Sequence, residues 1–517
     1  MNLQLVFVFC VLAIAIVALA RDAMRPGLIL LSASVVLMVG GTITPKEMLE
    51  GFSNKGMITV AMLYLVSEGV RRSGVLGKLI KLLLPSGKTT VRRMQFRMLP
   101  TVAFCSAFLN NTPVVVIFAP IIKRWAERLR IPSTKFLIPL SYATILGGMC
   151  TLIGTSTNLV VDGLVQDAGF KGFAMFELLK VGGFIAVAGI AYLVIFSTWL
   201  LPDERISDDD ISEDEAKGRL QRVEVVIGPR FSAIGRCIRE FDFRHKFDAT
   251  ILEMRRNGRT ILMHDLRNER FREGDTLVVL TDSHFVDTWG ESSFFLIVNG
   301  QKETEPAMPQ WKRITSVVLL VLMIAGATVG ELPVVREAFP RAHFDMFFFA
   351  TVVTIAMAWL RIYPVRKYTK FISWDILITI ASAFTISKAM MNSGVADTIA
   401  DFAIGLTTQY GPVVLLAFIF IVTDLFTELM TNNAAAALAF PISLSIAQHL
   451  GVSPMPFFVT ICMAASSSFS TPIGYQTNLI VQNVGGYRFS DFLRVGLPLN
   501  LIAFVLSVLL IPLIWPF

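Results

Sequence analysis

Long apolar runs are the main feature of the hydrophobic and polar pattern along the chain. Clear examples are Val317–Gly330, Phe344–Leu360 and Leu497–Ile514. A helix needs about 20 mostly apolar residues to cross the hydrocarbon core of a bilayer. We therefore expect transmembrane helices near residues 2–20, 26–42, 57–70, 136–168, 174–201, 312–331, 344–361, 372–389, 454–486 and 495–515.

Two of the expected spans are too long for one regular helix. Residues 136–168 contain Gly-Thr-Ser-Thr-Asn near their middle, and residues 454–486 contain Thr-Pro-Ile-Gly-Tyr-Gln-Thr-Asn. Freed backbone groups are costly in lipid unless they line a cavity or meet a ligand. We predict that both spans are broken helices whose interruptions face a polar site.

The chain resembles itself at an offset of about 320 residues, which indicates an internal repeat. Ser53–Val75 and Ser373–Val395 both begin with Ser and end with Ser-Gly-Val. Further on, Asn110-Asn111-Thr112 matches Asn432-Asn433-Ala434, and Ile153–Leu159 matches Ile473–Leu479. Matches in the same order predict two structural repeats, at residues 1–201 and 310–517.

Basic residues orient the first repeat. Residues 71–97 hold eight Lys or Arg and no acid, and residues 123–135 hold five against Glu127 alone. Both segments should be cytoplasmic by the positive-inside rule. Only 25 residues, 98–122, lie between them, whereas two crossings would need about 40. We therefore predict a re-entrant hairpin at 98–122, with its tip at Asn110–Pro113.

The second repeat is expected to be inverted. Its hairpin, residues 412–449 with a tip at Asn432-Asn433, has flanks nearly without charge, as is typical of an outer face. The predicted fold is an all-α polytopic membrane protein, with five spans and a re-entrant hairpin in each of two inverted repeats. Many secondary transporters have this architecture. We expect it in the plasma membrane, the inner membrane of a bacterium, with both termini outside.

A polar insert separates the repeats at residues 202–309. Residues 203–215 contain eight acids and one Arg, which is typical of a solvated linker. Beyond it we expect strands at Val223–Ile227, Ala249–Arg255 and Leu277–Leu280, and a short helix at Ala233–Phe241. The core, about residues 219–301, is predicted to be a small cytoplasmic α/β domain, which by its size should dimerise or dock.

Composition narrows the function classes. The chain is 54% hydrophobic and 16% charged, with a mean hydropathy of +0.64. The net charge of +7 does not indicate a nucleic-acid partner, because Lys and Arg gather in short loops between the spans. The five Cys are scattered, and no nucleophile–base pair or phosphate-binding loop is evident. We expect neither an enzyme nor an organic cofactor.

The predicted breaks and tips supply two kinds of ligand. Carbonyl, Asn and Thr oxygens suit sodium, and the free N–H groups of helix N-termini suit an anion. We therefore expect Na⁺ as coupling ion and a small anionic substrate, bound side by side near mid-membrane. Asp424 and Glu428, one helical turn apart, are candidates for proton or ion coupling. They fit equally well as acids that face a wet vestibule or cap the hairpin.

The segments Gly51–Asn54, Phe108–Pro113 and Thr427–Ala434, with the breaks that end in Asn158 and Asn478, resemble the divalent anion–sodium symporter family. That family belongs to the larger ion-transporter superfamily and carries Ser-Asn-Thr at each tip. Here the tips read Asn110-Asn111-Thr112 and Asn432-Asn433-Ala434.

The resemblance implies a set of ligand residues. One sodium site would use Ser106, Asn110, Asn111, Gly154 and Asn158. The other would use Thr427, Thr431, Asn433, Gly474 and Asn478. Substrate would lie among Asn111, Thr112, Thr155, Asn433, Ala434, Thr471 and Pro472. Because Ala434 lacks the hydroxyl of Thr112, the unequal tips favour a small tetrahedral anion over a symmetric dicarboxylate.

Three segments of the insert, Ser232–Arg236, Arg255–Gly258 and Phe271–Leu277, resemble the C-terminal regulatory module of potassium-uptake and potassium-channel gating proteins (the TrkA-C or RCK-C type). Such modules bind small ligands and often dimerise, which implies a homodimer and a small regulatory ligand. Symporters with this insert resemble the sulfate-handling branch, usually with two copies where this chain has one.

Several functions remain open. The leading hypothesis is sodium-coupled symport of a small divalent anion, most simply sulfate, by alternating access. The alternatives are a sodium-coupled dicarboxylate transporter, a sodium/proton antiporter or metalloid efflux permease, and a membrane sensor with vestigial transport. Only Asp424 and Glu428 support the antiporter, and the two hairpin tips argue against the sensor.

Overall fold

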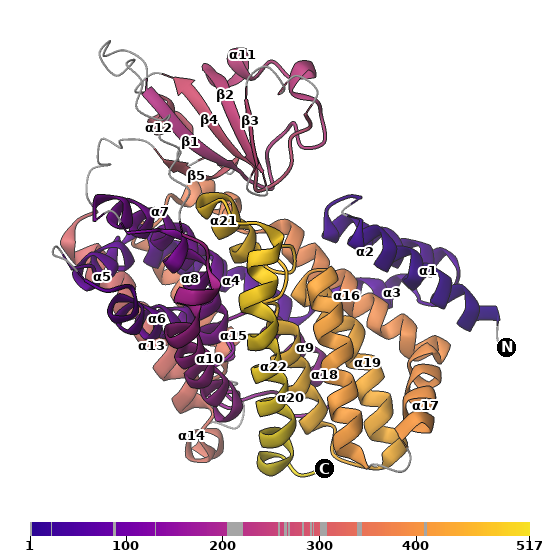
Figure 1. Cartoon of the computed structure of the whole chain (residues 1–517). Helices are drawn as coiled ribbons and strands as arrows, with labels where there is room; N and C mark the ends of the chain where they lie inside the picture. The colour runs from indigo at the N-terminus through magenta and orange to yellow at the C-terminus, as the bar shows by residue number, and fades with distance from the viewer. Residues whose placement is uncertain are drawn as a thin grey trace.

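A helical part carries a small sheet domain at one end in the computed structural model (Figure 1). The structure describes residues 3–21, 23–85, 89–129, 131–203, 221–256, 259–262, 266, 269–281, 284–289, 292, 294–299, 308–338, 344–407 and 411–517. The α-helices of the first half are α1 (Leu3–Ala20), α2 (Pro26–Val39), α3 (Pro45–Glu50), α4 (Lys55–Arg72), α5 (Val75–Leu83), α6 (Val91–Phe108), α7 (Asn111–Arg128), α8 (Thr134–Gly148), α9 (Ser156–Asp167) and α10 (Leu179–Leu200).

The helices of the two halves follow a similar order along the chain. In the first half α4 is followed by the short α5 and then by α6 to α10, and in the second half α16 is followed by α17 and then by α18 to α22. The pattern of long apolar runs did not predict the short helices α5 and α17. The α-helices of the second half are α13 (Gln310–Gly330), α14 (Pro333–Ala338), α15 (Met346–Trp359), α16 (Trp374–Ser393), α17 (Val395–Thr407), α18 (Pro412–Leu429), α19 (Asn432–Leu450), α20 (Met455–Ser466), α21 (Gln476–Gly485) and α22 (Phe489–Ile514).

Several helices are long and apolar enough to cross a membrane. Among the described residues five meet both conditions: α10, α13, α16, α18 and α22. The shorter apolar helices lie in α1, α2, α15 and α20. Leucine, isoleucine, valine and phenylalanine side chains on α10, α13, α18 and α22 remain exposed along one face, which is the surface that lipid would cover.

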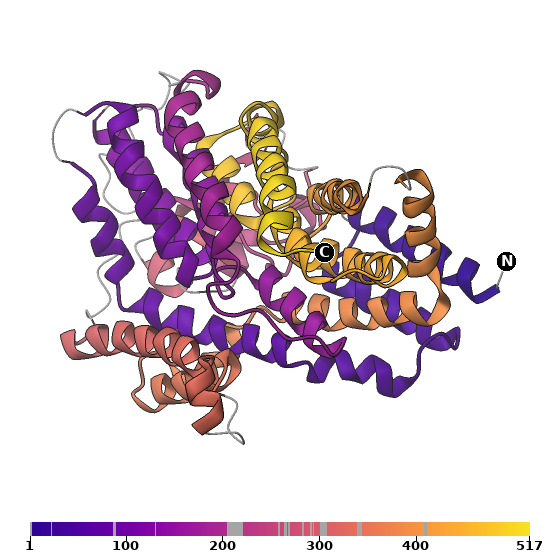
Figure 2. The same cartoon turned by 90° about the horizontal axis from the view of Figure 1, so that it is seen from below.

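The two halves exchange helices where they pack. α2 of the first half lies against α16, and α15 of the second half lies against α4. Ser34 Oγ donates to the Ser382 carbonyl in the first contact (3.3 Å), and Thr354 Oγ1 donates to the Met62 carbonyl in the second (3.2 Å). As a result α1 and α13 lie at opposite edges of the helical part (Figures 1 and 2).

The insert forms a five-stranded antiparallel sheet with strand order β3-β2-β4-β1-β5. Its strands are β1 (Gln221–Ile227), β2 (Ala249–Arg256), β3 (Arg259–Leu262), β4 (Thr276–Thr281) and β5 (Phe295–Asn299), with short helices α11 (Phe243–Phe247) and α12 (His284–Trp289). The three strands expected from the sequence lie within β1, β2 and β4. A cluster of phenylalanines, with Phe231 stacked on Phe247, fills the core.

The helix expected at Ala233–Phe241 is wrong. Turns occupy the start of this segment, and only Ile238–Glu240 forms a 3-10 turn. Gly235 takes a left-handed backbone conformation (φ +83°) and its N–H donates to the Phe271 carbonyl (2.8 Å). The backbone N–H groups of Gly235 and Ile238 donate to neighbouring loops, and the bonds inside the segment are of the turn type, three residues apart, so no α-helix forms.

Candidate functional site

Each hairpin turns within two residues. α6 ends at Phe108 and α7 begins at Asn111, so the first tip is Leu109 and Asn110. α18 ends at Leu429 and α19 begins at Asn432, so the second tip is Met430 and Thr431. The second tip therefore lies two residues before the expected Asn432-Asn433, and both asparagines belong to the first turn of α19.

The two hairpin tips have a similar side-chain contact. Ser106 Oγ donates to Asn111 Oδ1 (2.6 Å). Thr427 Oγ1 lies 3.0 Å from Asn432 Oδ1 and 2.7 Å from the Ala465 carbonyl oxygen. Both side-chain pairs are five residues apart, both asparagines begin a helix, and all four side chains are buried. Asn111 and Asn432 thus have similar local surroundings.

The sequence match pairs Asn110 with Asn432, whereas the helix starts and the hydrogen bonds pair Asn111 with Asn432. With this pairing Thr112 would stand opposite Asn433, and Ala434 would stand opposite Pro113. The comparison of Ala434 with Thr112, from which we favoured a tetrahedral anion, depends on the sequence pairing. Asn432 was not among the predicted ligands.

The two long helices are interrupted at equivalent places. α8 ends at Gly148 and α9 begins at Ser156, whereas α20 ends at Ser466 and α21 begins at Gln476. An asparagine closes each interruption by donating to carbonyls ten and seven residues earlier. Asn158 Nδ2 lies 3.4 and 2.9 Å from the Gly148 and Thr151 oxygens. Asn478 Nδ2 lies 2.9 and 3.2 Å from those of Ser468 and Thr471.

A threonine ties each interruption to the hairpin of its own half. Thr151 Oγ1 donates to the Ala107 carbonyl and accepts from the Gly154 N–H (3.1 Å). Thr471 Oγ1 donates to the Glu428 carbonyl (3.1 Å) and accepts from the Gly474 N–H (3.3 Å). The sequence indicated Thr471 but missed Thr151, although the two make similar hydrogen bonds.

The interruption comes close enough to the hairpin to share a site with it. A Cβ on Gly148 would lie 2.6 Å from Asn111 Oδ1, and one on Gly154 would lie 2.5 Å from the Gly148 carbonyl oxygen. In the second half a Cβ on Gly474 would lie 2.6 Å from the Thr427 carbonyl oxygen. Each half thus gathers hydroxyl, carboxamide and backbone oxygens around a glycine.

Four helix N-termini meet between the halves. Thr112 Oγ1, at the start of α7, donates to Gln476 Oε1 at the start of α21 (3.3 Å). Asn433 Oδ1, at the start of α19, accepts from Ser156 Oγ and Thr157 Oγ1 at the start of α9 (both 3.2 Å). Helix N-termini carry unpaired N–H groups and partial positive charge, so this meeting point favours an anion.

Tyr475, just before α21, links the N-termini of α7 and α9. Asn111 Nδ2 donates to its hydroxyl (2.5 Å), and Thr155 Oγ1 lies 3.2 Å from the same oxygen. Sequence analysis missed this residue, because it lies hundreds of positions from both partners. The predicted Pro472 lies in the same interruption and is buried.

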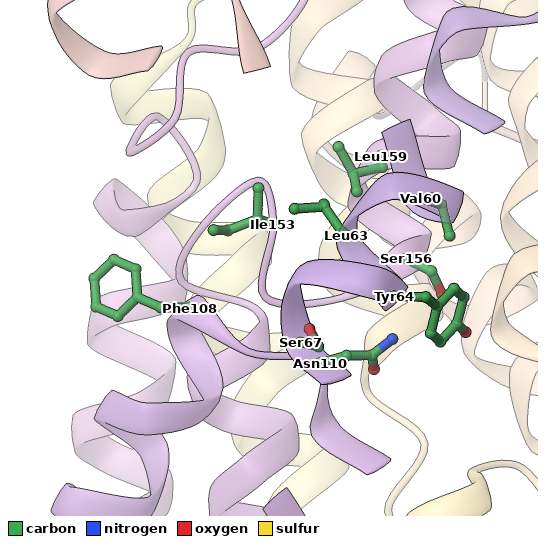
Figure 3. Close-up of a pocket in the computed structure, with 9 residues that line it drawn as sticks. All are labelled: Val60, Leu63, Tyr64, Ser67, Phe108, Asn110, Ile153, Ser156 and Leu159. Carbon is green, nitrogen blue, oxygen red and sulfur yellow. The ribbon is translucent and has the colours of Figure 1, made fainter. Parts of the chain in front are cut away.

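Asn110 faces a different space from Asn111. It lines a small pocket between α4, the first tip and the first interruption, with Tyr64, Ser67, Ser156 and five apolar side chains (Figure 3). The pocket adjoins the meeting point of the helices through Ser156, which also bonds to Asn433.

The two acids of α18 face α22 and the second interruption. Glu428 accepts from the N–H groups of Ser470 (2.7 Å) and Thr471 (2.8 Å) and from Asn500 Nδ2 (3.0 Å). Asp424 Oδ2 lies 3.4 Å from the same Asn500 nitrogen. Glu428 therefore caps the interruption, while Asp424 has one buried carboxyl oxygen without a partner among the described residues.

Comparison with known proteins assigns the chain to a family. The model of the family described as "Citrate transporter" matches residues 10–442 and 335–516. The chain belongs to the citrate transporter family. It is therefore a multi-pass membrane transporter and not an enzyme, in agreement with the sequence analysis.

Three named proteins have sequences similar to that of this transporter. "Uncharacterized transporter sll0640" of Synechocystis sp. is 32% identical over 93% of this chain and 92% of its own length. "Putative sulfur deprivation response regulator" of Chlamydomonas reinhardtii is 28% identical over 94% and 98%. "Sodium/sulfate cotransporter 1" of the same organism is 32% identical over 57% of this chain and 34% of its own length.

Proposed function

We propose that this transporter is a sodium-coupled symporter of a small divalent anion, and that the anion is sulfate. The observation that carries the proposal is the meeting of four helix N-termini, α7, α9, α19 and α21, joined by neutral side chains. None of the hydrogen bonds that join them involves Lys or Arg. Backbone N–H groups would hold the anion, and sodium ions beside them would balance its charge.

Buried oxygens without partners support a sodium site in each half. Among the described residues, Asn158 Oδ1 and Thr431 Oγ1 are buried and accept no hydrogen bond. Buried polar atoms are almost always satisfied, so each such atom calls for an unseen partner. In the first site we place Ser106, Asn111, Gly154 and Asn158. In the second we place Thr427, Thr431, Asn432 and Gly474.

Tyr475 supports a small anion. Its hydroxyl lies within hydrogen-bonding distance of both Asn111 and Thr155, so we infer that its side chain leaves less room for a substrate as long as a dicarboxylate. The name of the relative called a sodium/sulfate cotransporter points the same way. A sodium-coupled dicarboxylate transporter is the alternative that this tyrosine disfavours.

The proposed mechanism is alternating access between inverted repeats in the plasma membrane. The matching helix order of the two halves, and the paired bonds of their hairpins and interruptions, support such a repeat. We place the insert on the cytoplasmic side and both termini outside, as the basic loops indicate. The insert further suggests a homodimer and a small regulatory ligand.

Uptake into proteoliposomes tests the proposal. Labelled sulfate, succinate and phosphate are offered with and without an inward sodium gradient. We expect sulfate uptake that depends on sodium, with little uptake of succinate. Uptake indifferent to sodium would refute sodium coupling. Absence of uptake of all three anions would refute the symport proposal and favour the sensor hypothesis.

Asp424 gives a second candidate, in which protons contribute to coupling. It shares the Asn500 carboxamide with Glu428, and no described Lys or Arg forms an ion pair with either acid. Two charged carboxylates so close in the membrane would be costly, so one should carry a proton. Replacing Asp424 with Asn mimics the protonated form.

The Asp424→Asn variant separates the two candidates. If sodium alone drives transport, its sodium-dependent sulfate uptake should stay within about two-fold of wild type, since the variant preserves the shape of the cluster. If the protein is an antiporter, an imposed pH gradient should drive sodium flux in wild type and not in the variant. Flux driven by pH would displace the symport proposal.

A further inference from the structure

One turn of the insert touches a helix of the candidate site. This contact turn, Phe271–Asp275, meets α21, which lies directly below the sheet domain (Figure 1). The Gly274 carbonyl accepts from Asn483 Nδ2, and Glu273 Oε1 lies 3.5 Å from Gln476 Nε2. Gln476 and Asn483 are seven residues apart, so they lie on the same face of α21.

The contact turn has a fixed shape. Gly274 adopts φ +84°, which glycine tolerates without strain. Asp275 is 2% exposed and accepts from the Arg272 N–H (2.8 Å). The Arg256 guanidinium also holds it with two hydrogen bonds, of 2.7 and 2.6 Å. A bidentate pair of this kind is strong and directional, so the turn presents Glu273 in a defined position.

Glu273 connects through one side chain to a predicted substrate ligand. Gln476 Nε2 faces Glu273, and Gln476 Oε1 accepts from Thr112 Oγ1 at the start of α7 (3.3 Å). The carboxylate thus lies at the positive end of α21, where the proposed anion would also bind. A tethered negative charge there competes with the anion for the same helix end.

The sheet domain is also attached to other elements around the site. Arg230 Nη2 donates to the Ile372 carbonyl just before α16 (2.8 Å). Glu224 lies 3.7 Å from Lys123 Nζ near the end of α7. Alternating access requires the elements around a site to move against each other, and one rigid domain fastened to α7, α16 and α21 opposes that movement.

We propose that the contact turn is an autoinhibitory latch. While Glu273 and Gly274 hold α21, the transporter remains in one conformation with a carboxylate beside the anion site, and transport requires the turn to leave. A ligand that binds the displaced insert would therefore activate transport. The inference rests on the proposed function in one respect, namely that this site binds an anion.

Two variants and a control test the latch in the full-length protein. Glu273→Ala removes the charge, and Asn483→Ala removes the bond to Gly274. Glu240→Ala changes another acid of the insert, one that is exposed and has no described side-chain bond. Amide hydrogen exchange of residues 476–485 and initial rates of sodium-driven sulfate uptake are measured for each protein.

The latch predicts faster exchange in α21 and roughly two- to five-fold faster uptake in Glu273→Ala and Asn483→Ala, with Glu240→Ala like wild type. Unchanged exchange in both variants would overturn it, and so would faster exchange with slower uptake, because the contact would then support transport. If wild type transports none of the three anions, the proposed function fails, and hydrogen exchange alone decides whether the latch exists.

Discussion

The asparagines that begin α7 and α19 are both buried. The Oδ1 atoms of Asn111 and Asn432 lie 2.6 and 3.0 Å from a hydroxyl oxygen five positions earlier. Each carboxamide oxygen keeps a second lone pair that a cation can use. Loss of either carboxamide oxygen should therefore weaken sodium binding most directly.

Replacing Asn111 or Asn432 with Ala should raise the sodium concentration for half-maximal uptake by about ten-fold or more, since a bond to a charged group is lost. The measurement is sulfate uptake as a function of sodium at equal protein in the membrane. Asn392→Ala, at a partly exposed position near Glu47, is the matched control and should leave sodium dependence unchanged. Unaltered sodium activation in both variants would remove these residues from the sodium sites.

Sequence analysis named Asn111 among the sodium ligands, but in the second half it named Asn433 and not Asn432. Both tips contain an Asn-Asn pair, so the sequence favoured aligning Asn110-Asn111 with Asn432-Asn433. The equal spacing of Ser106 to Asn111 and of Thr427 to Asn432 could have indicated the pairing of Asn111 with Asn432. Tyr475 could not have been found in this way, because its importance depends on partners brought near only by folding.

Among the helices, the two interrupted pairs, α8 with α9 and α20 with α21, form the frame of the candidate site. The side-chain amides of Asn158 and Asn478 donate to carbonyls that the interruptions leave free. Glycines let the interrupted backbone pack closely against neighbouring atoms, with no room for a Cβ. Both breaks were predictable from polar residues in long apolar spans. The short helices α5 and α17 were not, because they are too short to give an apolar run of membrane length.

Gly154 tests how tightly this frame is packed. In Gly154→Ala the new Cβ would lie 2.5 Å from a backbone oxygen, so we expect a destabilisation of about 1–3 kcal/mol and loss of uptake. Gly77→Ala is the control, because no atom lies within 4 Å of its added Cβ. It should be neutral or slightly stabilising. Thermal unfolding in detergent measures both, and equal unfolding temperatures would contradict the tight packing.

At the scale of the whole molecule, the main question is how the two halves are oriented and packed against each other. The positive-inside pattern predicts the orientation, whereas the exchange of α2 and α15 between halves has no signature in the sequence. Packing between residues so far apart is decided by surface shape, which a pattern of apolar positions does not encode.

Cysteine labelling tests the inversion. In a background without the native cysteines, Thr90→Cys marks the flank of the first hairpin and Gln448→Cys that of the second; both positions are exposed. A membrane-impermeant maleimide should label only Gln448→Cys in intact cells and only Thr90→Cys in inside-out vesicles. Labelling of both from the same side would show that the hairpins are not inverted.

The exchanged helices have a consequence for how the protein is made. Ser34 meets Ser382 after 348 further residues have been synthesised, and α4 likewise waits for α15. During translation, the first half therefore stands in the membrane with two of its faces lacking their protein partners. Although the sequence reads as two copies, neither copy contains its own complete set of neighbours, and biogenesis must end with both halves assembling as one unit.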